Sequence, residues 1–333
     1  MGISVTSKNE VRILHLYRDL MNLYGDWANV AVLERLLGAR GVKTTVDCKS
    51  VGDDIDFGEY DFVYIGSGTE RSQRACMRDM SRRGQDFLDR IEAGMIVLAT
   101  GNSHELFGKA ITEASGERYD TLGLLDFETA RLASRVTGDC VCAVTRSPLM
   151  ATATVSLPAP PPAESQTPAE SQTPAKSQTL AESQTPAGSQ TPADFPPDKL
   201  IGFINRAGGG QTGNVERPFI TMLGPGACDK AVMTDTMNSA VNITAPNGIN
   251  SEGANTERSN SFSEGVIYKN LLGTYMTGPV LVRNPPLLKY LADRLCPESH
   301  DKGTGGDAFF EYQEAAYRSA LTELSARIGK HGK

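Results

Sequence analysis

The stretch IVLATGNSHELFGKA, residues 96–110, places hydroxyl and imidazole side chains at the end of an apolar run. The run predicts a buried strand, and the residues after it predict a sharp turn and the start of a helix. Many α/β enzymes hold a nucleophile at such a turn, where an adjacent base activates a hydroxyl or a thiol. The residue at this turn is Gly101, which has no side chain, and its neighbours include Thr100, Ser103 and His104.

These neighbours are poor substitutes for a nucleophile at the turn. A shift of one residue at a strand end turns a side chain to the opposite face, which argues against Thr100. A hydroxyl such as that of Ser103 is a weak nucleophile unless a base is positioned beside it. We interpret His104 as a surface or capping residue in the first turn of the helix. A rewired site that uses Ser103 or His104 is the alternative.

The composition of the chain excludes several function classes. With 333 residues and 39% hydrophobic content, the chain is long enough for one large core, with or without appendages. A net charge of -7 argues against broad binding to the phosphate backbone of nucleic acids. No apolar run approaches the roughly 20 residues that span a membrane, and the first residues lack the pattern of a signal peptide. We therefore expect a cytoplasmic protein with no nucleic-acid partner and no membrane insertion.

The cysteines and histidines suggest neither disulfides nor a metal site. Six cysteines are scattered along a long chain, which is not the pattern of a disulfide framework. Four histidines show no spacing with cysteine that suggests zinc. Cys140 and Cys142 alternate on a predicted strand and should face the same side. We expect buried structural thiols, no metal and no cofactor.

Strand and helix patterns alternate along the first hundred residues. Apolar or alternating runs predict strands at 11–17, 42–48, 60–68 and 95–100. Apolar residues at helical spacing predict helices at 26–41 and 72–94, each closed by a glycine. Helical crossovers between strands predict an α/β fold with a mostly parallel sheet and helices on both faces.

Two polar stretches interrupt the pattern further along the chain. Residues 163–194 repeat a six-residue unit, AESQTP, with almost no large apolar side chains. Such a segment cannot bury enough surface to offset its ordering entropy, so residues 157–197 are predicted to be a disordered insert. Residues 247–264 are predicted to be a polar loop. The remaining signals predict one domain over residues 11–295, with strands at 139–145, 200–205, 217–223 and 264–270, and an amphipathic helix at 306–328 that packs on the core or contacts a partner.

Several longer motifs carry a family resemblance. LHLYRDLMNLYGDWANV, YIGSGTERSQ, LGLLDFET, GFIN and EGVIYKNLLGTYMTGPVLVRNP occur in the order seen in GatD-type proteins. This sequence therefore resembles the CobB/CobQ-like class I glutamine amidotransferases over about residues 11–288. The resemblance implies a flavodoxin-like class I amidotransferase fold. In that family a MurT-like Mur ligase activates the glutamate carboxylate of lipid II with ATP, and the GatD subunit supplies ammonia from glutamine for peptidoglycan synthesis.

The same resemblance shows that two reacting groups are replaced. The family's cysteine motif, similar to A-x-C-G-G-Y-Q-L-L-G, matches ATGNSHELFG and puts Gly101 at the position of the nucleophile. The family's histidine motif, G-T-Y-L-H-G-P, matches GTYMTGP and puts Thr277 at the position of the base. The nearest cysteine in sequence, Cys76, lies on the preceding helix. We therefore expect no catalytic residues in this chain.

Other parts of the pocket are retained or changed. Gly66, Ser67 and Gly68 follow a strand, where the family's glycine turn offers N–H groups to an oxyanion; a plain tight turn is the alternative. Arg135, in RVTGD, resembles the family's arginine that binds the α-carboxylate of glutamine; a surface arginine beside an edge strand is the alternative. Three departures bear on glutamine binding: Glu105 replaces a glutamine, and Ile204 and Arg206 replace polar residues of the motif G-F-E-N-H.

Three hypotheses follow from this pattern. The first is a non-catalytic GatD-like subunit that docks on a MurT-like ligase in the amidation of lipid II. The second is an active glutaminase with a rewired site. The third is a small-molecule binding or sensing protein that reuses the pocket, with glutamine as the candidate ligand.

Overall fold

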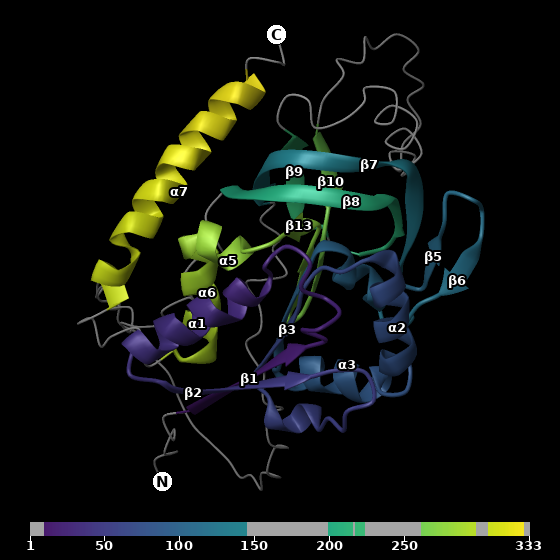
Figure 1. The fold of residues 1–333 in the computed structure, drawn as a ribbon, viewed down its shortest axis with the longest axis horizontal. Coiled ribbons are helices and arrows are strands. Elements are labelled where there is room, and N and C mark those ends of the chain that lie inside the picture. Colours follow the sequence, from purple (N-terminus) through teal and green to yellow (C-terminus); the bar gives the residue numbers. More distant parts are fainter. Residues whose placement is uncertain (1–9, 145–198, 216, 224–260, 298–305, 330–333) are drawn as a thin grey trace, which may run out of the picture.

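A computed structural model describes residues 10–144, 199–215, 217–223, 261–297 and 306–329. The predicted insert at 157–197 and residues 247–260 of the predicted loop lie outside the described residues. Figure 1 shows two β-sheets with helices packed around them. Among the described residues, no helix has the length and apolar character that crossing a membrane requires.

The first sheet is mostly parallel, as the alternation of strands and helices predicts. Its strand order is β11-β12-β4-β3-β1-β2, and every neighbouring pair is parallel except β11 with β12. After β10 of the second sheet, the chain returns to this sheet through β11 and β12, and β12 pairs with β4. The strands are β1 (Glu10–Leu16), β2 (Lys43–Lys49), β3 (Phe62–Ile65), β4 (Ile96–Thr100), β11 (Val266–Tyr268) and β12 (Leu271–Thr274).

Helices cover both faces of this sheet because successive strand residues point to opposite sides. One set of alternate strand residues packs with α1 (Trp27–Ala39), α5 (Val280–Arg283) and α6 (Pro285–Leu295). The other set packs with α2 (Glu70–Met80) and α3 (Gly84–Ala93). Figure 1 shows these two groups of helices on opposite sides of the strands. The mostly parallel sheet with helices on both faces is thus confirmed.

The single helix predicted at 72–94 is wrong, because the chain breaks into α2 and α3. The N–H of Arg83 donates to the carbonyl of Met80, three residues back, and the backbone at Arg83 leaves helical geometry at φ -134°. The break lets Cys76 and Met80 of α2 and Phe87 of α3 join one apolar cluster on the same face of the sheet. The predicted glycine cap is present, since Gly94 follows α3 with a φ of +122°.

The second sheet is mainly antiparallel and was not predicted as a separate layer. Long strands β7 (Phe127–Val144) and β8 (Lys199–Gly213) pair along most of their length. Residues 261–264, predicted to end a polar loop, instead form strand β10, since they pair with β9 and bury Glu264. The shorter strands are β5 (Ala110–Thr112), β6 (Arg118–Asp120), β9 (Phe219–Leu223), β10 (Ser261–Glu264) and β13 (Met276–Thr277).

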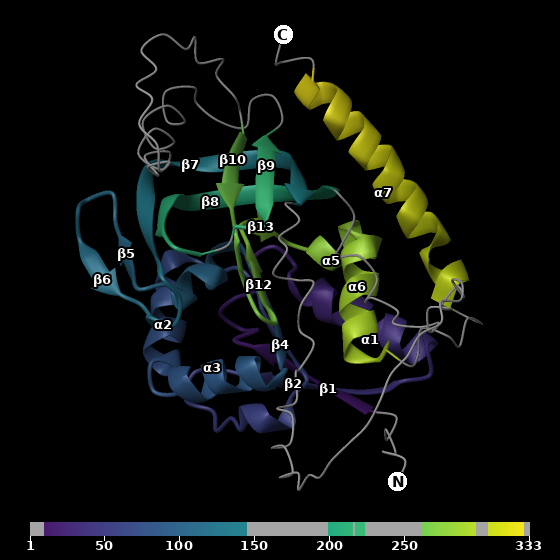
Figure 2. The same ribbon diagram turned by 180° about the vertical axis from the view of Figure 1, so that it is seen from behind.

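The last helix, α7 (Gly306–Gly329), runs along one side of the molecule, past α5 and α6 to the ends of β7 and β8 (Figures 1 and 2). Tyr317 packs with Val141 of β7 and Ile201 of β8, and its hydroxyl donates to the carbonyl of Lys199 at 2.5 Å. These contacts join α7 to the antiparallel layer.

Of the five cysteines that the structure describes, four are buried free thiols. Cys140 and Cys142 face the same side of β7, with their sulfur atoms 3.9 Å apart. Cys48 is exposed, so the expectation of a buried thiol is wrong at this position. The reason is that Cys48 lies on β2, the edge strand of the first sheet.

Candidate functional site

The candidate site lies where β3 and β4 end, at the carboxyl edge of the parallel sheet. Directly after β4, the chain enters a 3-10 helix, η2 (Gly101–Phe107), in place of the predicted α-helix. Gly101 has a φ of +64°, in the left-handed region that residues with a side chain rarely adopt. The predicted sharp turn is therefore present at Gly101.

The turn brings the ends of three strands together. A Cβ atom built on Gly101 would lie 3.2 Å from Cγ2 of Thr277, so the positions expected for nucleophile and base are neighbours. That Cβ atom would also lie only 2.3 Å from Cβ of Ser67, which follows β3. Ser67 thus fills the space that a side chain at position 101 would need. Thr277 is buried, and its hydroxyl donates to the carbonyl of Phe203 at 3.1 Å.

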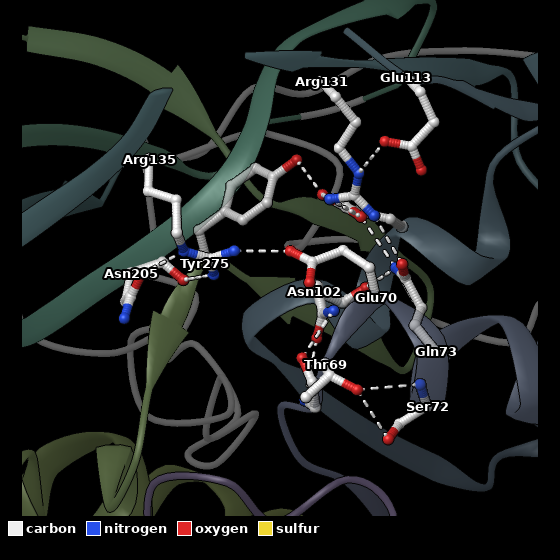
Figure 3. Close-up of polar contacts among 12 residues, drawn as sticks. Thr69, Glu70, Ser72, Gln73, Asn102, Glu113, Arg131, Arg135, Asn205 and Tyr275 are labelled. Carbon is white, nitrogen blue, oxygen red and sulfur yellow. Dashed lines mark hydrogen bonds and ion pairs between the residues drawn. The ribbon is translucent and has the colours of Figure 1, made fainter. Parts of the chain in front are cut away.

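The glycine turn after β3 is held by side chains of the protein itself. The N–H of Gly68 donates to Oδ1 of Asn102 at 3.1 Å, and Nδ2 of Asn102 donates back to the carbonyl of Gly68 at 3.0 Å (Figure 3). Ser67 donates its hydroxyl to both oxygens of Asp26, at 2.9 and 3.0 Å. The N–H of Gly68, one of the expected oxyanion donors, is therefore already engaged.

Asp26 is a buried carboxylate at the centre of this cluster, and the sequence analysis missed it. Burial raises the pKa of the Asp26 carboxyl above its ordinary value, although hydrogen bonds from the Tyr24 N–H and the Ser67 hydroxyl favour the charged form. The N–H of Gly278 also donates to Asp26 at 3.2 Å. The carboxylate therefore ties the loop after β1 to the loop that carries Ser67 and to Gly278, directly after β13. The motif YGDWAN offered a signal for a buried polar site, since Asp26 and Asn29 stand there among apolar residues.

Ser103 and His104 do not face the site, which removes geometric support from a rewired nucleophile or base. The Ser103 hydroxyl donates to two backbone carbonyls, those of Ile65 at 3.0 Å and Thr100 at 2.8 Å. His104 is fully buried, so its interpretation as a surface or capping residue is wrong. Its ring contacts the Gly101 carbonyl and the Gln211 side chain through its two nitrogens, and burial lowers its pKa to about 3. The tight 3-10 turn is what directs this ring inward.

Arg135, the predicted carboxylate-binding residue, is held by the protein's own polar groups. Its side chain is 44% exposed and pairs with Glu70 at 2.6 Å (Figure 3). Its other two guanidinium nitrogens donate to the side chain and backbone carbonyls of Asn205, at 2.7 and 3.0 Å. Glu70 is the first residue of α2, so this ion pair links the second sheet to the helix that follows Gly66–Gly68. All three nitrogen atoms of the guanidinium have acceptors.

Below the turn lies a buried polar cluster built around Glu105. Arg131, which is 2% exposed, pairs with Glu105 at 2.9 Å, and Gln73 and Tyr275 each donate to the same carboxylate at 2.8 Å (Figure 3). Burial by itself would lower the pKa of Arg131, but the charge of Glu105 and the contact with Tyr275 raise it above its ordinary value. The charge that Glu105 adds is thus compensated. Sequence analysis missed Arg131, Gln73 and Tyr275, because they come from β7, from α2 and from the segment between β12 and β13.

The other two departures from the family motif are also built into the core. Ile204 is fully buried and pairs with Met276 across β8 and β13. Arg206 is 7% exposed, with its guanidinium 4.0 Å from the ring centre of Phe262 and 4.5 Å from that of Tyr275. Among the described residues, no three histidine, cysteine or acidic side chains gather closely enough to hold a metal ion.

Comparisons with known proteins agree with this architecture. Residues 12–156 match the CobB/CobQ-like glutamine amidotransferase domain. The chain is 26% identical over 288 residues to the GatD subunit of the glutamine-hydrolysing lipid II isoglutaminyl synthase of Staphylococcus aureus, covering 86% of this chain and 85% of that protein. It is 33% identical over 120 residues to the GatD subunit of Streptococcus pneumoniae, covering 36% of this chain and 46% of the relative.

One solved structure shows a weak overall similarity to this chain. It is the glutaminase domain of Trypanosoma brucei CTPS with bound acivicin, at 9% identity and a TM-score of 0.40, with 85% of this chain and 93% of that chain covered. The family match and the two relatives agree with the motifs and with the mostly parallel sheet. Residues 12–156 therefore match a CobB/CobQ-like glutamine amidotransferase domain, with the class I amidotransferase fold, and the chain is similar to GatD subunits over most of its length.

Proposed function

We propose that this chain is a non-catalytic GatD-type subunit that assembles with a MurT-like ligase in the amidation of lipid II. The two relatives are named as GatD subunits of lipid II isoglutaminyl synthase, and one of them aligns with 86% of this chain. A subunit of such a synthase needs a ligase partner that activates the glutamate carboxylate.

The observation that carries the proposal is the pairing of Gly101 and Thr277. Thioester chemistry on glutamine needs a thiolate nucleophile, a base and an oxyanion site that act together. Gly101 and Thr277 occupy neighbouring positions at the carboxyl edge of the sheet. Gly101 has no side chain to act as a nucleophile, and the Thr277 hydroxyl cannot act as a base near neutral pH. Ser67 fills the adjacent space, and Asn102 takes the N–H of Gly68.

In this proposal the subunit shapes or regulates the ligase, which draws nitrogen from free ammonia or another donor. Arg135 remains a candidate for binding the α-carboxylate of glutamine. For glutamine to bind there, it would have to displace Glu70, which lies 2.6 Å from the guanidinium. We therefore expect glutamine to bind weakly or not at all.

Co-purification with a MurT-like ligase, followed by a glutaminase assay on the complex, tests the proposal. We expect a stable complex that releases no measurable ammonia from glutamine but still consumes ATP in the presence of lipid II and ammonium. Failure to co-purify would overturn the assignment as a subunit. Ammonia release that Ser103→Ala abolishes would instead establish a rewired enzyme.

Substitutions that rebuild the site sharpen the test. Gly101→Cys with Thr277→His restores nucleophile and base, but the new Cβ atom at position 101 overlaps Ser67. We expect measurable turnover only when Ser67→Gly is added, and none from any single change, because such groups act as a unit. Turnover by Gly101→Cys alone would contradict the assignment of Thr277 to the base position.

A further inference from the structure

One face of α2 carries a row of arginines. Gln73, Cys76 and Met80 point into the protein. On the opposite side, arginines recur every three or four residues, from the first turn of α2 to the turn that follows it. They are Arg71, Arg74, Arg78 and Arg82, of which all but the half-buried Arg74 are exposed.

This arginine face is largely without counter-charges in the part of the chain that the structure describes. Arg74 pairs with Glu113 at 2.6 Å and stacks over the ring of Tyr119. Arg78 donates to the carbonyl of Arg74, and no described carboxylate forms an ion pair with Arg71, Arg78 or Arg82. Like charges three and four residues apart destabilise a helix. The repulsion within the row therefore lowers the stability of the helix. The row is also a local positive charge on a chain whose net charge is -7.

The guanidinium groups favour phosphate as their partner. Arginine binds phosphate oxygens through two parallel N–H donors, which lysine cannot do. Arg71 and Arg78 are about 10 Å apart along the helix axis. Helix α2 lies near β5 and β6 (Figures 1 and 2), and Arg71, Arg78 and Arg82 are exposed. A flat phosphate-bearing surface fits a single helix face better than a nucleic acid, which requires a basic groove and many phosphate contacts.

We propose that the arginine face of α2 docks on the anionic phospholipid headgroups of a membrane surface. This proposal rests on the proposed function, because a lipid-linked substrate lies at such a surface. The helix begins two residues after Gly68, and Glu70 of its first turn pairs with Arg135 of the candidate site. Docking through α2 therefore holds the candidate site close to the headgroups without inserting any residue into the membrane.

Vesicle sedimentation of the full chain, without ligase or glutamine, tests this docking surface. The probes are vesicles of phosphatidylcholine with about one-third phosphatidylglycerol, and vesicles of phosphatidylcholine alone, at low and at high salt. The test variant is Arg71→Gln with Arg78→Gln and Arg82→Gln. The matched control is Lys43→Gln with Arg318→Gln and Arg327→Gln, which removes the same charge from exposed positions elsewhere.

We expect the unmodified chain and the control to bind the anionic vesicles at low salt and not the neutral ones. The test variant should bind about 100-fold more weakly, which corresponds to about 1 kcal/mol per arginine. Its melting temperature should not fall, because glutamine is a good helix former and the like charges are gone. Equal binding by both triple variants, or no binding by the unmodified chain, would overturn the proposal.

A nucleic acid that displaces the chain from vesicles at equal phosphate concentration would assign the face to a different partner and also overturn it. Co-purification with the ligase is measured separately. Loss of vesicle binding with an intact complex therefore rejects only this docking surface, and a failed complex rejects the proposed function.

Discussion

Gly101 combines two constraints that belong to different parts of the residue. Its φ of +64° penalises any side chain through the backbone, and its missing Cβ leaves room for Ser67 at 2.3 Å. Gly41 provides a natural comparison. It has a similar φ of +75°, but no atom lies within 4 Å of the Cβ position. The two glycines therefore separate backbone strain from steric overlap.

We expect Gly101→Val to lower the free energy of unfolding by about 1–3 kcal/mol. Gly41→Val, as the control, should show the backbone cost alone and lose less. Ser67→Gly in the Gly101→Val chain should recover part of the difference, because it removes the overlapping Cβ atom. Urea unfolding followed by circular dichroism measures all three. An unchanged urea midpoint for Gly101→Val would contradict the left-handed backbone conformation at Gly101.

At the scale of elements, the cluster around Glu105 ties η2 to α2, β7 and the segment between β12 and β13. Glu105 and Arg131 are both fully buried, so each charge depends on the other for compensation. Removing one partner from such a pair costs far more than the pair contributes, because it leaves a buried charge. Exposed pairs such as Arg118 with Glu128 lack this dependence.

We expect Arg131→Met to destabilise the protein by about 3–5 kcal/mol. Adding Glu105→Gln should recover part of this loss, since the unpaired charge is gone while the amide keeps its hydrogen bonds to Gln73 or Tyr275. The control, Arg118→Met, should cost less than about 1 kcal/mol. A double variant as unstable as Arg131→Met alone would show that packing, and not charge, dominates the cluster.

The elements could be predicted from the sequence where local pattern decides them. Strands β1 to β4 are apolar or alternating and are accompanied by helices of regular period, so their succession along the chain could be predicted. The break between α2 and α3 could not be predicted in this way. Ser81 to Arg83 contain no proline that would interrupt a helix, and the nearest glycine, Gly84, is itself the first residue of α3. Strand β10 was missed because its sequence is polar and only pairing with β9 makes it a strand.

The candidate site divides in the same way. The motif positions fixed Gly101 and Thr277, and the structure brings those two positions together. The contacts of Asn102 with Gly68, and of Glu70 with Arg135, join residues that are 34 and 65 positions apart. No local pattern encodes such pairs, so the self-occupied state of the site became visible only in three dimensions.

At the scale of the whole molecule, two buried histidines make stability depend on pH. Burial lowers the pKa of His15 to about 4 and that of His104 to about 3. The unfolded chain binds these protons near pH 6.5, well before the folded chain does, so stability is lost as pH falls below 6.5. Asp26 and Glu264 have raised pKa values and act in the opposite sense at lower pH.

His15→Phe isolates one contribution, because the ring packs edge-on against Tyr64 and Nε2 has no described partner. We expect little change in stability at pH 7.5. Between pH 6.5 and about 4, the variant should gain on the unmodified chain by up to about 1.4 kcal/mol per pH unit. Parallel urea titrations at four pH values measure this. A constant difference across the range would mean that folding does not shift the pKa of His15.

The repeats provide a second prediction at this scale. Their composition cannot form a core, and closing a longer loop costs little additional entropy. Ala143 of β7 and Lys199 of β8 are register partners, so the described residues on either side of this segment lie next to each other. We expect deletion of Ala163 to Asp194 to leave the melting temperature nearly unchanged. A cooperative loss of folding would show that the repeats pack against the domain.

The pairing of Ala143 with Lys199 also makes the segment between them a suitable site for inserting another protein domain. A folded protein whose own termini lie close together, such as a fluorescent protein, could replace the repeats without prising β7 from β8. Its fluorescence would report where the chain resides in a living cell, with no tag added at either end of the sequence. An affinity tag inserted at the same site could be used to purify a ligase partner from a cell extract and to determine its mass.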